Sequence, residues 1–269
     1  MGAHHLRVAV LAEWAWDPSS VELDPTTGNV DRRRTASVPG PGSLDAVELG
    51  LRLGSVTAYT IGGRESDEVL RRCLAMGAAS AVRAADLAGL VQALRTERFD
   101  LVLVSWRSGH QSPSPLGPML AGLLGLPQVT AVDELAVDGS DRALVRRRLG
   151  RGEREELAVP LPAVVAVEPG IVTPRLGSPA AVLEAEAATI PVLEAQASAA
   201  PQAVFLGYRP PRPAAPRTRA PDSGLSAEAR IAEVVGLGAP ERHRELVTGS
   251  AEELAARIVA FLEERGFFD

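Results

Sequence analysis

Short apolar runs alternate along the first 193 residues with segments in which apolar residues recur every three or four positions. The runs Leu6–Ala12, Leu101–Val104 and Ala163–Val167 have almost no polar interruption, as parallel strands covered on both faces do. Residues 44–53 between the first two runs have the periodicity of an amphipathic helix. This alternation predicts an α/β fold, in which a doubly wound, mostly parallel sheet carries helices on its faces.

The clearest strand–loop–helix unit spans Phe99–Val132. A buried strand is predicted at Leu101–Val104, followed by a polar loop at Ser105–Pro115. Pro118 is predicted to be the first helical residue, a position where its missing N–H does no harm. A second strand is predicted to begin at Val129. The apolar face of the helix is predicted to consist of Met119, Leu120, Leu123 and Leu124.

Two loops of this pattern are candidate ligand sites. Open α/β sheets bind ligands where a strand ends and the next helix begins, because the first N–H groups of the helix have no partner. Ser105–Pro115 is such a loop, and the turn Gly62-Gly63 is another. Ser66 is the predicted N-cap of the helix Asp67–Met76 after that turn, and Asp86 is the predicted cap of the next helix. For both loops, a connection that binds nothing remains an alternative.

Residues 135–159 predict an antiparallel meander, since glycine-bearing turns separate short strand-like runs. This segment is rich in charge. Its basic residues are Arg146, Arg147, Arg148, Arg151 and Arg154, and they are interleaved with Glu153, Glu155 and Glu156. A solvated surface on which these charges pair with one another is favoured over an anion-binding site.

The composition changes near residue 194, which divides the chain into three predicted regions. Residues 1–193 form the α/β domain of a nucleotide-binding type. Residues 194–224 are rich in Ala and Pro and predict an extended arm or linker. Residues 225–269 hold an amphipathic helix, for which Ser250 and Glu253 have the spacing of a capping box. Because this helix follows a long arm, we expect it to dock on a partner.

The composition also excludes several kinds of chemistry. The chain has 28 basic residues, all of them arginine, so a phosphate-binding or Schiff-base lysine is excluded. The single cysteine, Cys73, excludes an intramolecular disulfide, and its apolar neighbours favour a core thiol. The net charge of −6 argues against nucleic acid as a partner. The N-terminus lacks a secretory-signal pattern and no apolar run is long enough to span a bilayer, which favours a cytoplasmic protein.

The residues offer little for catalysis. The histidines are His4, His5, His110 and His243, and only His110 falls in a candidate ligand loop. Neither a nucleophile with its base nor a metal-binding motif is recognisable, so no catalytic residue and no metal site is predicted. The sequence therefore favours binding over catalysis.

Three stretches resemble one known family. The unit around residues 100–130, with DLVL before the loop and GPMLAGLLGLPQVT after it, is similar to the β subunit of electron transfer flavoprotein. Leu70–Ala78 (LRRCLAMGA) resembles a helix-end signature of that family. Leu161–Val167 (LPAVVAV), followed by Pro174-Arg175, resembles its late strand and the loop after it. The three stretches occur in the family's order over roughly residues 6–185.

The resemblance implies a fold of the adenine-nucleotide hydrolase-like type and a function as an electron carrier, not an enzyme. It implies a heterodimer in which the α subunit holds most of the FAD, a dehydrogenase as electron donor, and a downstream acceptor as the only link to a membrane. It also implies a structural AMP. By the same resemblance, AMP would meet Leu11, Gly62, Gly63, Ser66, Gln111, Ser112, Ser114, Leu116 and Gly117. Partner recognition would involve Arg175, Leu176, Pro179 and Val182.

Several residues depart from the family pattern. Glu13 and Trp14 stand where the family commonly has a basic pair, and Pro115 offers no N–H to a phosphate. Pro179 replaces an expected leucine in the recognition loop. AMP is therefore expected to bind weakly. The alternatives are an adenine-nucleotide-binding protein, as in universal stress proteins, or a hydrolase-like enzyme of the same superfamily. A neighbouring gene for an FAD-binding α subunit would separate the first interpretation from these.

Overall fold

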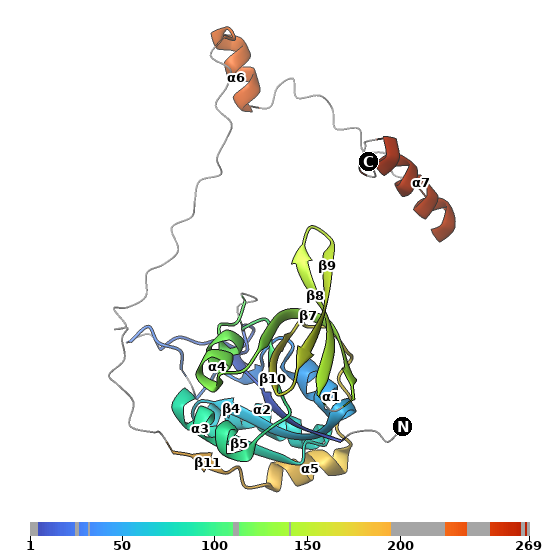
Figure 1. The fold of residues 1–269 in the computed structure, drawn as a ribbon. Coiled ribbons are helices and arrows are strands. Elements are labelled where there is room, and N and C mark those ends of the chain that lie inside the picture. The colour runs from blue at the N-terminus through green and yellow to red at the C-terminus, as the bar shows by residue number, and fades with distance from the viewer. Residues whose placement is uncertain are drawn as a thin grey trace. The chain divides into compact units, whose positions relative to one another are not determined.

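A computed structural model of the chain describes residues 5–24, 27–31, 33–109, 113–139, 141–194, 224–235, 248–264 and 267, with 233–235 as backbone only. The chain divides into two units, Met1–Tyr208 and Arg209–Asp269 (Figure 1). The boundaries predicted at residues 193 and 224 stay predictions, because residues 195–223 lie outside the described part.

The first unit is built on one nine-stranded sheet with the order β11-β5-β4-β1-β6-β10-β7-β8-β9. The strands from β11 to β7 run parallel, and β8 and β9 add two antiparallel strands at one end. The predicted mostly parallel α/β sheet is therefore confirmed. The strands are β1 (Leu6–Leu11), β4 (Gly54–Ile61), β5 (Ser80–Ala84), β6 (Leu101–Ser105), β7 (Gln128–Asp138), β8 (Arg142–Gly150), β9 (Glu153–Pro160), β10 (Ala163–Val167) and β11 (Val192–Leu193).

Helices cover both faces of the parallel strands (Figure 1). The helices α1 (Ser43–Leu53) and α2 (Asp67–Met76) share one apolar core with the sheet, and α3 (Leu87–Glu97) and α4 (Leu116–Leu124) share the other. The helix α5 (Pro179–Ala187) packs against α2. Both faces of the central strands are thus buried, which explains why these strands are apolar without interruption.

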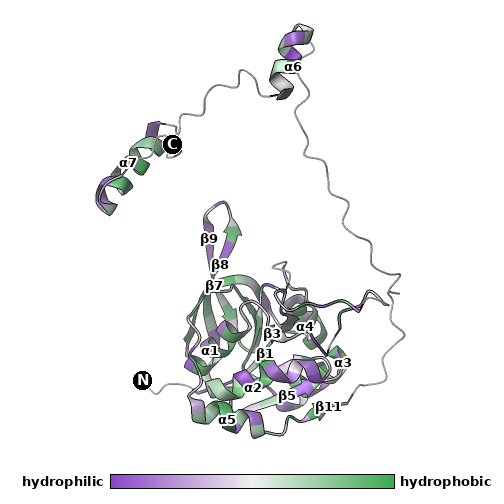
Figure 2. Ribbon diagram, turned by 180° about the vertical axis from the view of Figure 1, so that it is seen from behind, coloured by the Kyte–Doolittle hydropathy of each residue, from purple (hydrophilic) through white to green (hydrophobic). Residues whose placement is uncertain are grey.

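The strand β1 illustrates this double burial. Val8 and Val10 belong to one core, and Ala9 and Leu11 belong to the other. Side chains alternate across a strand, so a strand with a helix layer on each side needs apolar residues at every position. Figure 2 shows the resulting hydrophobic colour along the central strands. Cys73 on α2 is fully buried in the first core, as predicted, and burial raises the pKa of its thiol to about 12.

The predicted start of α4 and the predicted capping of α2 by Ser66 are wrong, whereas α2 begins at Asp67 as predicted. The helix α4 begins at Leu116, two residues before Pro118, and its Met119 and Leu123 are 45% and 46% exposed. Only one stripe of this short helix reaches the core. Ser66 precedes α2, but its hydroxyl donates to the carbonyl of Gly63 within the 3₁₀ turn Arg64–Ser66 and does not cap the helix. The cap predicted at Asp86 is confirmed, since its Oδ1 accepts the Gly89 N–H at 2.7 Å.

The meander prediction is confirmed, with β7, β8 and β9 forming consecutive hairpins whose tip extends beyond the rest of this unit (Figure 1). β7 joins two runs that were predicted as separate strands. It is irregular at the junction: Ala131 has φ 57, and the pairing register shifts between Val132 and Glu134. Asp133 is the extra residue of this bulge.

The bulge brings Asp133 to a cluster of arginines that the sequence did not predict. Its carboxylate accepts from Arg146 Nε at 3.0 Å, Arg148 Nε at 3.3 Å and Arg154 Nε at 2.7 Å. The Asp133 side chain is only 10% exposed. The predicted pairing among the interleaved charges themselves is confirmed for Arg147 and Glu155, at 2.6 Å. β9, which carries four charged residues at its start, is the edge of the sheet.

Smaller elements complete the two units. In the first unit, β2 (Trp14–Trp16) pairs with β3 (Ser37–Pro39), and a single antiparallel bridge joins Leu23 to Val30. The second unit holds α6 (Ala227–Val235) and α7 (Ala251–Glu264). The capping box predicted at the start of α7 is confirmed by reciprocal hydrogen bonds between Ser250 and Glu253. Across the described residues, none of the helices has the length and apolar character that spanning a bilayer requires.

Candidate functional site

The candidate site lies where the winding of the sheet reverses. From β1 the chain passes through α1 to β4 on one side, whereas β6 lies on the other side of β1. The loops that follow β1 and β6 therefore separate, and the crevice between them is the usual ligand position in sheets of this kind. Glu13 enters this crevice after β1, and Ser114 enters it just before α4.

Glu13 and Ser114 close the crevice through a direct contact. The Ser114 hydroxyl donates to Glu13 Oε1 at 2.7 Å, and Ser114 is 2% exposed. The backbone of Glu13 is held as well, because its N–H donates to Ser43 Oγ at 3.0 Å and its carbonyl accepts from Gly40 N–H at 2.7 Å. Burial raises the pKa of Glu13, and the hydrogen bond from Ser114 offsets this only in part.

The N-terminus of α4 has few N–H groups left for a ligand. Pro115 and Pro118 have none. The N–H of Leu116 donates to Ser114 Oγ at 3.4 Å, and the N–H of Met119 donates to the carbonyl of Pro115 at 3.0 Å. Gly117 lies between them and is buried against the sheet, where an added Cβ would lie 3.1 Å from a methyl of Val104.

Trp14 covers the second candidate loop. Its Nε1 donates to the carbonyl of Ile61 at 3.0 Å, and a Cβ added at Gly62 would lie 2.8 Å from this nitrogen. Trp14 and Trp16 meet edge to face, with ring centroids 5.0 Å apart. Ser66 is fully buried. The side chain of Trp14 therefore lies directly on the glycine turn after β4.

A shallow pocket of about 410 Å³ lies at the adjoining strand ends and is lined by Pro41, Arg107, Glu168 and Pro169. Arg107 Nε lies 3.4 Å from Glu168 Oε2, and Glu168 is 7% exposed. Ser105 fixes the backbone beneath the pocket: its hydroxyl accepts the Arg107 N–H at 3.0 Å and lies against the carbonyl of Pro41. A cation and an anion neutralise each other here, so the pocket has no strong preference for a charged ligand.

The four residues predicted for partner recognition lie together in the loop after β10 and the first turn of α5. Leu176 is 94% exposed and Val182 is 39% exposed. The Arg175 side chain is half exposed, and its Nε lies 2.6 Å from Oε2 of the buried Glu48. The hydrogen bond from Arg175 lowers the pKa of Glu48, whose side chain is 5% exposed, to about 2. Arg175 thus anchors the loop that presents Leu176.

Other contacts hold the same segment. Gly177 packs on α2, where an added Cβ would lie 2.7 Å from the carbonyl oxygen of Ala75. Ser178 caps α5 by accepting the Ala181 N–H at 3.2 Å. At the other end of α5, one guanidinium nitrogen of Arg71 lies 2.6–3.1 Å from three carbonyl oxygens. An exposed apolar surface is therefore presented on a fixed segment.

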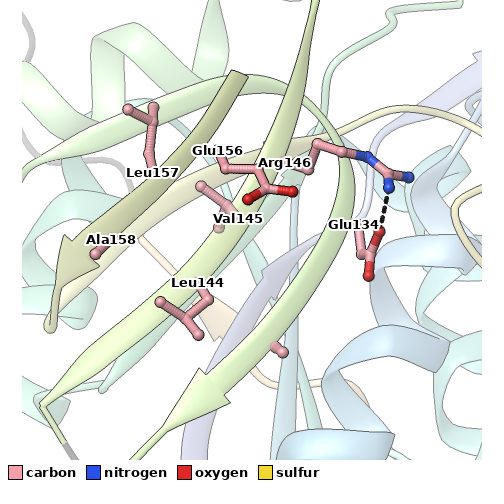
Figure 3. A pocket seen from close by; sticks show the side chains of 8 residues that line it. Glu134, Leu144, Val145, Arg146, Glu156, Leu157 and Ala158 are labelled. Atoms are coloured by element: carbon pink, nitrogen blue, oxygen red, sulfur yellow. Dashed lines mark ion pairs between the residues drawn. The ribbon is translucent and has the colours of Figure 1, made fainter. Parts of the chain in front are cut away.

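A second pocket, of about 380 Å³, lies on the antiparallel strands β7–β9 (Figure 3). Arg146 and Glu134 form an ion pair of 2.6 Å beside it. The lining residues are Glu134, Ala136, Leu144, Val145, Arg146, Glu156, Leu157 and Ala158. Among the residues that the structure describes, no cluster of three or more His, Cys, Asp or Glu side chains could hold a metal ion.

The structure brings some predicted nucleotide contacts together. Ser114, Leu116 and Gly117 lie at the start of α4, and Leu11 of β1, which is 2% exposed, belongs to the apolar core that α4 shares. Gly62, Gly63 and Ser66 lie after β4. Gln111 and Ser112, like His110, fall outside the described residues. The roles assigned to all these residues stay predictions. Sequence reasoning missed the Glu13–Ser114 contact, for which the available signal is an acidic residue directly after the apolar run Leu6–Ala12.

The strand order and the helices on both faces define a doubly wound α/β domain. Residues 27–198 match the family model of the electron transfer flavoprotein domain, and because this is well over half of the chain, the protein belongs to that family. The relatives place it on the β-subunit side, so the predicted family is confirmed.

Three relatives give the extent of the likeness. The chain is 27% identical to caffeyl-CoA reductase-Etf complex subunit CarD of Acetobacterium woodii, over 77% of this chain and 88% of that protein. It is 28% identical to an electron transfer flavoprotein subunit beta of Methylophilus methylotrophus, over 78% and 76%. It is also 28% identical to the same subunit of Thermoanaerobacterium thermosaccharolyticum, over 64% and 72%.

Proposed function

We propose that this chain is the β subunit of a heterodimeric, cytoplasmic electron transfer flavoprotein. In this proposal it passes electrons from a dehydrogenase to a downstream acceptor through FAD that the α subunit mainly holds. The observation that carries the proposal is the family match, which spans residues 27–198 and includes the loop after β6. The flavin would supply the redox chemistry, and the protein would position it.

The residues of the crevice are consistent with a binding role. Glu13 contacts a serine, and Arg107 lies beside Glu168. These pairs do not combine a nucleophile, a base and an orienting group, as acyl or glycosyl transfer would require. This favours an electron-carrying subunit over a hydrolase of the same superfamily.

Co-expression with an FAD-binding α subunit tests the proposal. We expect the purified complex to be yellow, with stoichiometric FAD, and the isolated chain to carry little or none. A stoichiometric flavin spectrum from the isolated chain would contradict the assignment of most FAD contacts to the partner. Failure of any α subunit to associate would contradict the heterodimer.

We further propose that Leu176 and Val182 contact the dehydrogenase. What supports this is their exposure on a segment that Arg175 and Arg71 anchor. Leu176→Ala is expected to slow electron transfer from the dehydrogenase about tenfold, because a leucine that is 94% exposed in the free chain has most of its apolar surface to bury against a partner. The matched control is Leu149→Ala, a half-exposed leucine on β8. Equal rates for both variants would contradict the proposed contact, provided that FAD content is unchanged.

A further inference from the structure

We propose that Glu13 and Trp14 occupy the place that the family resemblance assigns to AMP, so that the protein fills this crevice with its own side chains and excludes the nucleotide. This goes beyond the proposed electron-carrying function. It depends on the family assignment only for the position of the nucleotide. The residues that carry it come from the loop after β1 and from the starts of α2 and α4.

Glu13 lies at the position that the family resemblance assigns to the phosphate of AMP. Its carboxylate lies beside the start of α4 and accepts a hydrogen bond from the Ser114 hydroxyl at 2.7 Å. Ser114 is one of the few side chains before this helix that could have bound a phosphate oxygen. A phosphate placed at the same hydroxyl would lie within a few ångströms of the half-buried Glu13 carboxylate. Repulsion of that kind should weaken binding by about a hundredfold or more.

The backbone of α4 supports the same conclusion. Anions bind at helix N-termini through unpaired N–H groups. Here the prolines at 115 and 118 remove two donors, the Leu116 N–H is directed to Ser114, and the Met119 N–H closes the first turn of the helix. The N–H of Gly117 remains, and this residue is buried against Val104. A single buried N–H donor cannot replace the several hydrogen-bond donors that hold a phosphate.

Trp14 lies at the position that the family resemblance assigns to the adenosine part of AMP. Its indole lies on the turn after β4, with Nε1 bound to the carbonyl of Ile61 and within 2.8 Å of the Cβ position of Gly62. The absence of a side chain at Gly62 thus allows the Trp14 indole to lie close to the backbone. We infer that the indole occupies the space that an adenine would need. Ser66 is fully buried and donates to Gly63, so its hydroxyl is already used.

The carboxylate of Glu13 differs from the other buried carboxylates of this unit. Glu48 and Asp133 accept from arginines, and so each is neutralised where it lies. The contact of the Glu13 carboxylate is a neutral hydroxyl. A carboxylate in this position is an anion that the protein itself supplies beside the start of α4.

The first experiment uses the complex with the α subunit. The purified protein is denatured, and FAD and AMP are separated and quantified by chromatography. We expect FAD without stoichiometric AMP. Stoichiometric AMP would overturn this inference and leave the proposed function intact. Absence of FAD would instead count against the proposed function, so the two failures are distinguishable.

The second experiment titrates AMP and adenosine into the full chain by calorimetry. The variants are Glu13→Gln, Trp14→Ala and the double variant, with Trp16→Ala as the matched control. We expect the wild type and the control to bind neither compound measurably at millimolar concentration. Glu13→Gln should improve binding of AMP by about tenfold or more relative to adenosine, because it removes only the charge. Trp14→Ala should improve binding of both.

Glu13→Gln keeps an acceptor for Ser114, so this variant should fold even if the double variant does not. Near-UV circular dichroism checks that each variant is native. Wild-type binding of AMP in the micromolar range would refute the inference. The same holds if folded Glu13→Gln shows no gain in AMP binding over the control, because the carboxylate would then not be the excluding group.

Discussion

The crevice between the loops after β1 and β6 and the antiparallel strands β7–β9 each contain a carboxylate that is largely withdrawn from solvent. The surroundings shift the pKa values of these two carboxylates in opposite directions. In the crevice, burial raises the pKa of Glu13, and one serine hydroxyl offsets this only in part. In the antiparallel strands, burial alone would raise the pKa of Asp133, but hydrogen bonds from Arg146, Arg154 and Arg148 lower it below its ordinary value.

This difference in partners and in pKa indicates that the Asp133 carboxylate has a structural role, whereas the Glu13 carboxylate fills a site. Asp133 fixes three side chains from two strands, and its removal would leave their charges without their common partner. The Glu13 carboxylate instead holds one neutral hydroxyl, that of Ser114, and burial of its charge opposes folding. A protein keeps such a group where its charge has a use, which agrees with the inference that Glu13 excludes a nucleotide.

The largest effect on stability is expected from Asp133→Ala. Removal of the carboxylate leaves Arg146, Arg148 and Arg154 close together, and the free energy of unfolding should fall by about 2–3 kcal/mol. The estimate is at the lower end for a charged network because the arginines are partly exposed. Chemical denaturation measures the change. The control is Glu155→Ala, which breaks one exposed pair and should cost about 0.5 kcal/mol. Equal losses would contradict the role assigned to the bulge.

Glu48→Gln should have the next largest effect, about 1–2 kcal/mol, because it weakens the contact that anchors Arg175. The loop should also become a better substrate for trypsin at the Arg175–Leu176 bond. Glu68→Gln, which affects an exposed pair with Arg72 on α2, is the matched control.

The pH dependence of the wild type gives a second test of Glu48. Its pKa is about 2 in the folded chain, below the ordinary 4.5. The stability it contributes is therefore present above pH 4.5 and is lost as the pH falls toward 2. Glu48→Gln should remove this part of the acid sensitivity. An unchanged acid transition would show that other carboxylates dominate it.

Glu13→Gln should have a smaller effect and the opposite sign. The folded-state pKa of Glu13 is raised above 4.5, so the group favours the fold most below that pH, and this contribution is lost as the pH rises through the raised pKa. At neutral pH the amide should therefore be more stable than the carboxylate by about 0.5–1 kcal/mol. Melting temperatures measured at acid and neutral pH test this. A destabilised variant at neutral pH would mean that the charge of Glu13 has a stabilising partner.

The smallest effect on the first unit is expected from deleting residues 195–269. The buried apolar residues of the described chain run from Leu6 to Ala185, so the deletion removes none of them. The remaining chain should keep its circular dichroism and a similar melting temperature. Its affinity for an α subunit should fall, because α7 has exposed apolar residues such as Ile258 and Phe261. A truncated chain that does not fold would contradict this division of the molecule.

The sheet could be predicted well from the sequence because its strands are covered on both faces. Leu101–Val104 and Ala163–Val167 were located to within one residue by their uninterrupted apolar character. The start of α4 was missed because proline is favoured at the first helical position, and here it is the third. Periodicity alone also failed to show that Met119 and Leu123 face solvent, since burial depends on what lies above the helix.

The decisive contacts of the candidate site could not be predicted in this way. Glu13 and Ser114 are 101 positions apart, and only the winding of the sheet brings them together. Asp133 reaches its arginines because β7 has a bulge between Val132 and Glu134, close to Ala131, whose positive φ alanine rarely adopts. Both contacts depend on the tertiary fold and leave no local pattern in the sequence.

The two ends of the nine-stranded sheet also limit self-association. An open edge strand exposes a row of unpaired N–H and C=O groups, on which a second molecule can add a strand and begin an aggregate. At one end, β11 has only two residues and offers little to pair with. At the other end, β9 begins with Glu153, Arg154, Glu155 and Glu156 and finishes with Pro160. Because a strand added there would desolvate these charges and meet a proline, concentrated solutions of the protein should resist fibril formation.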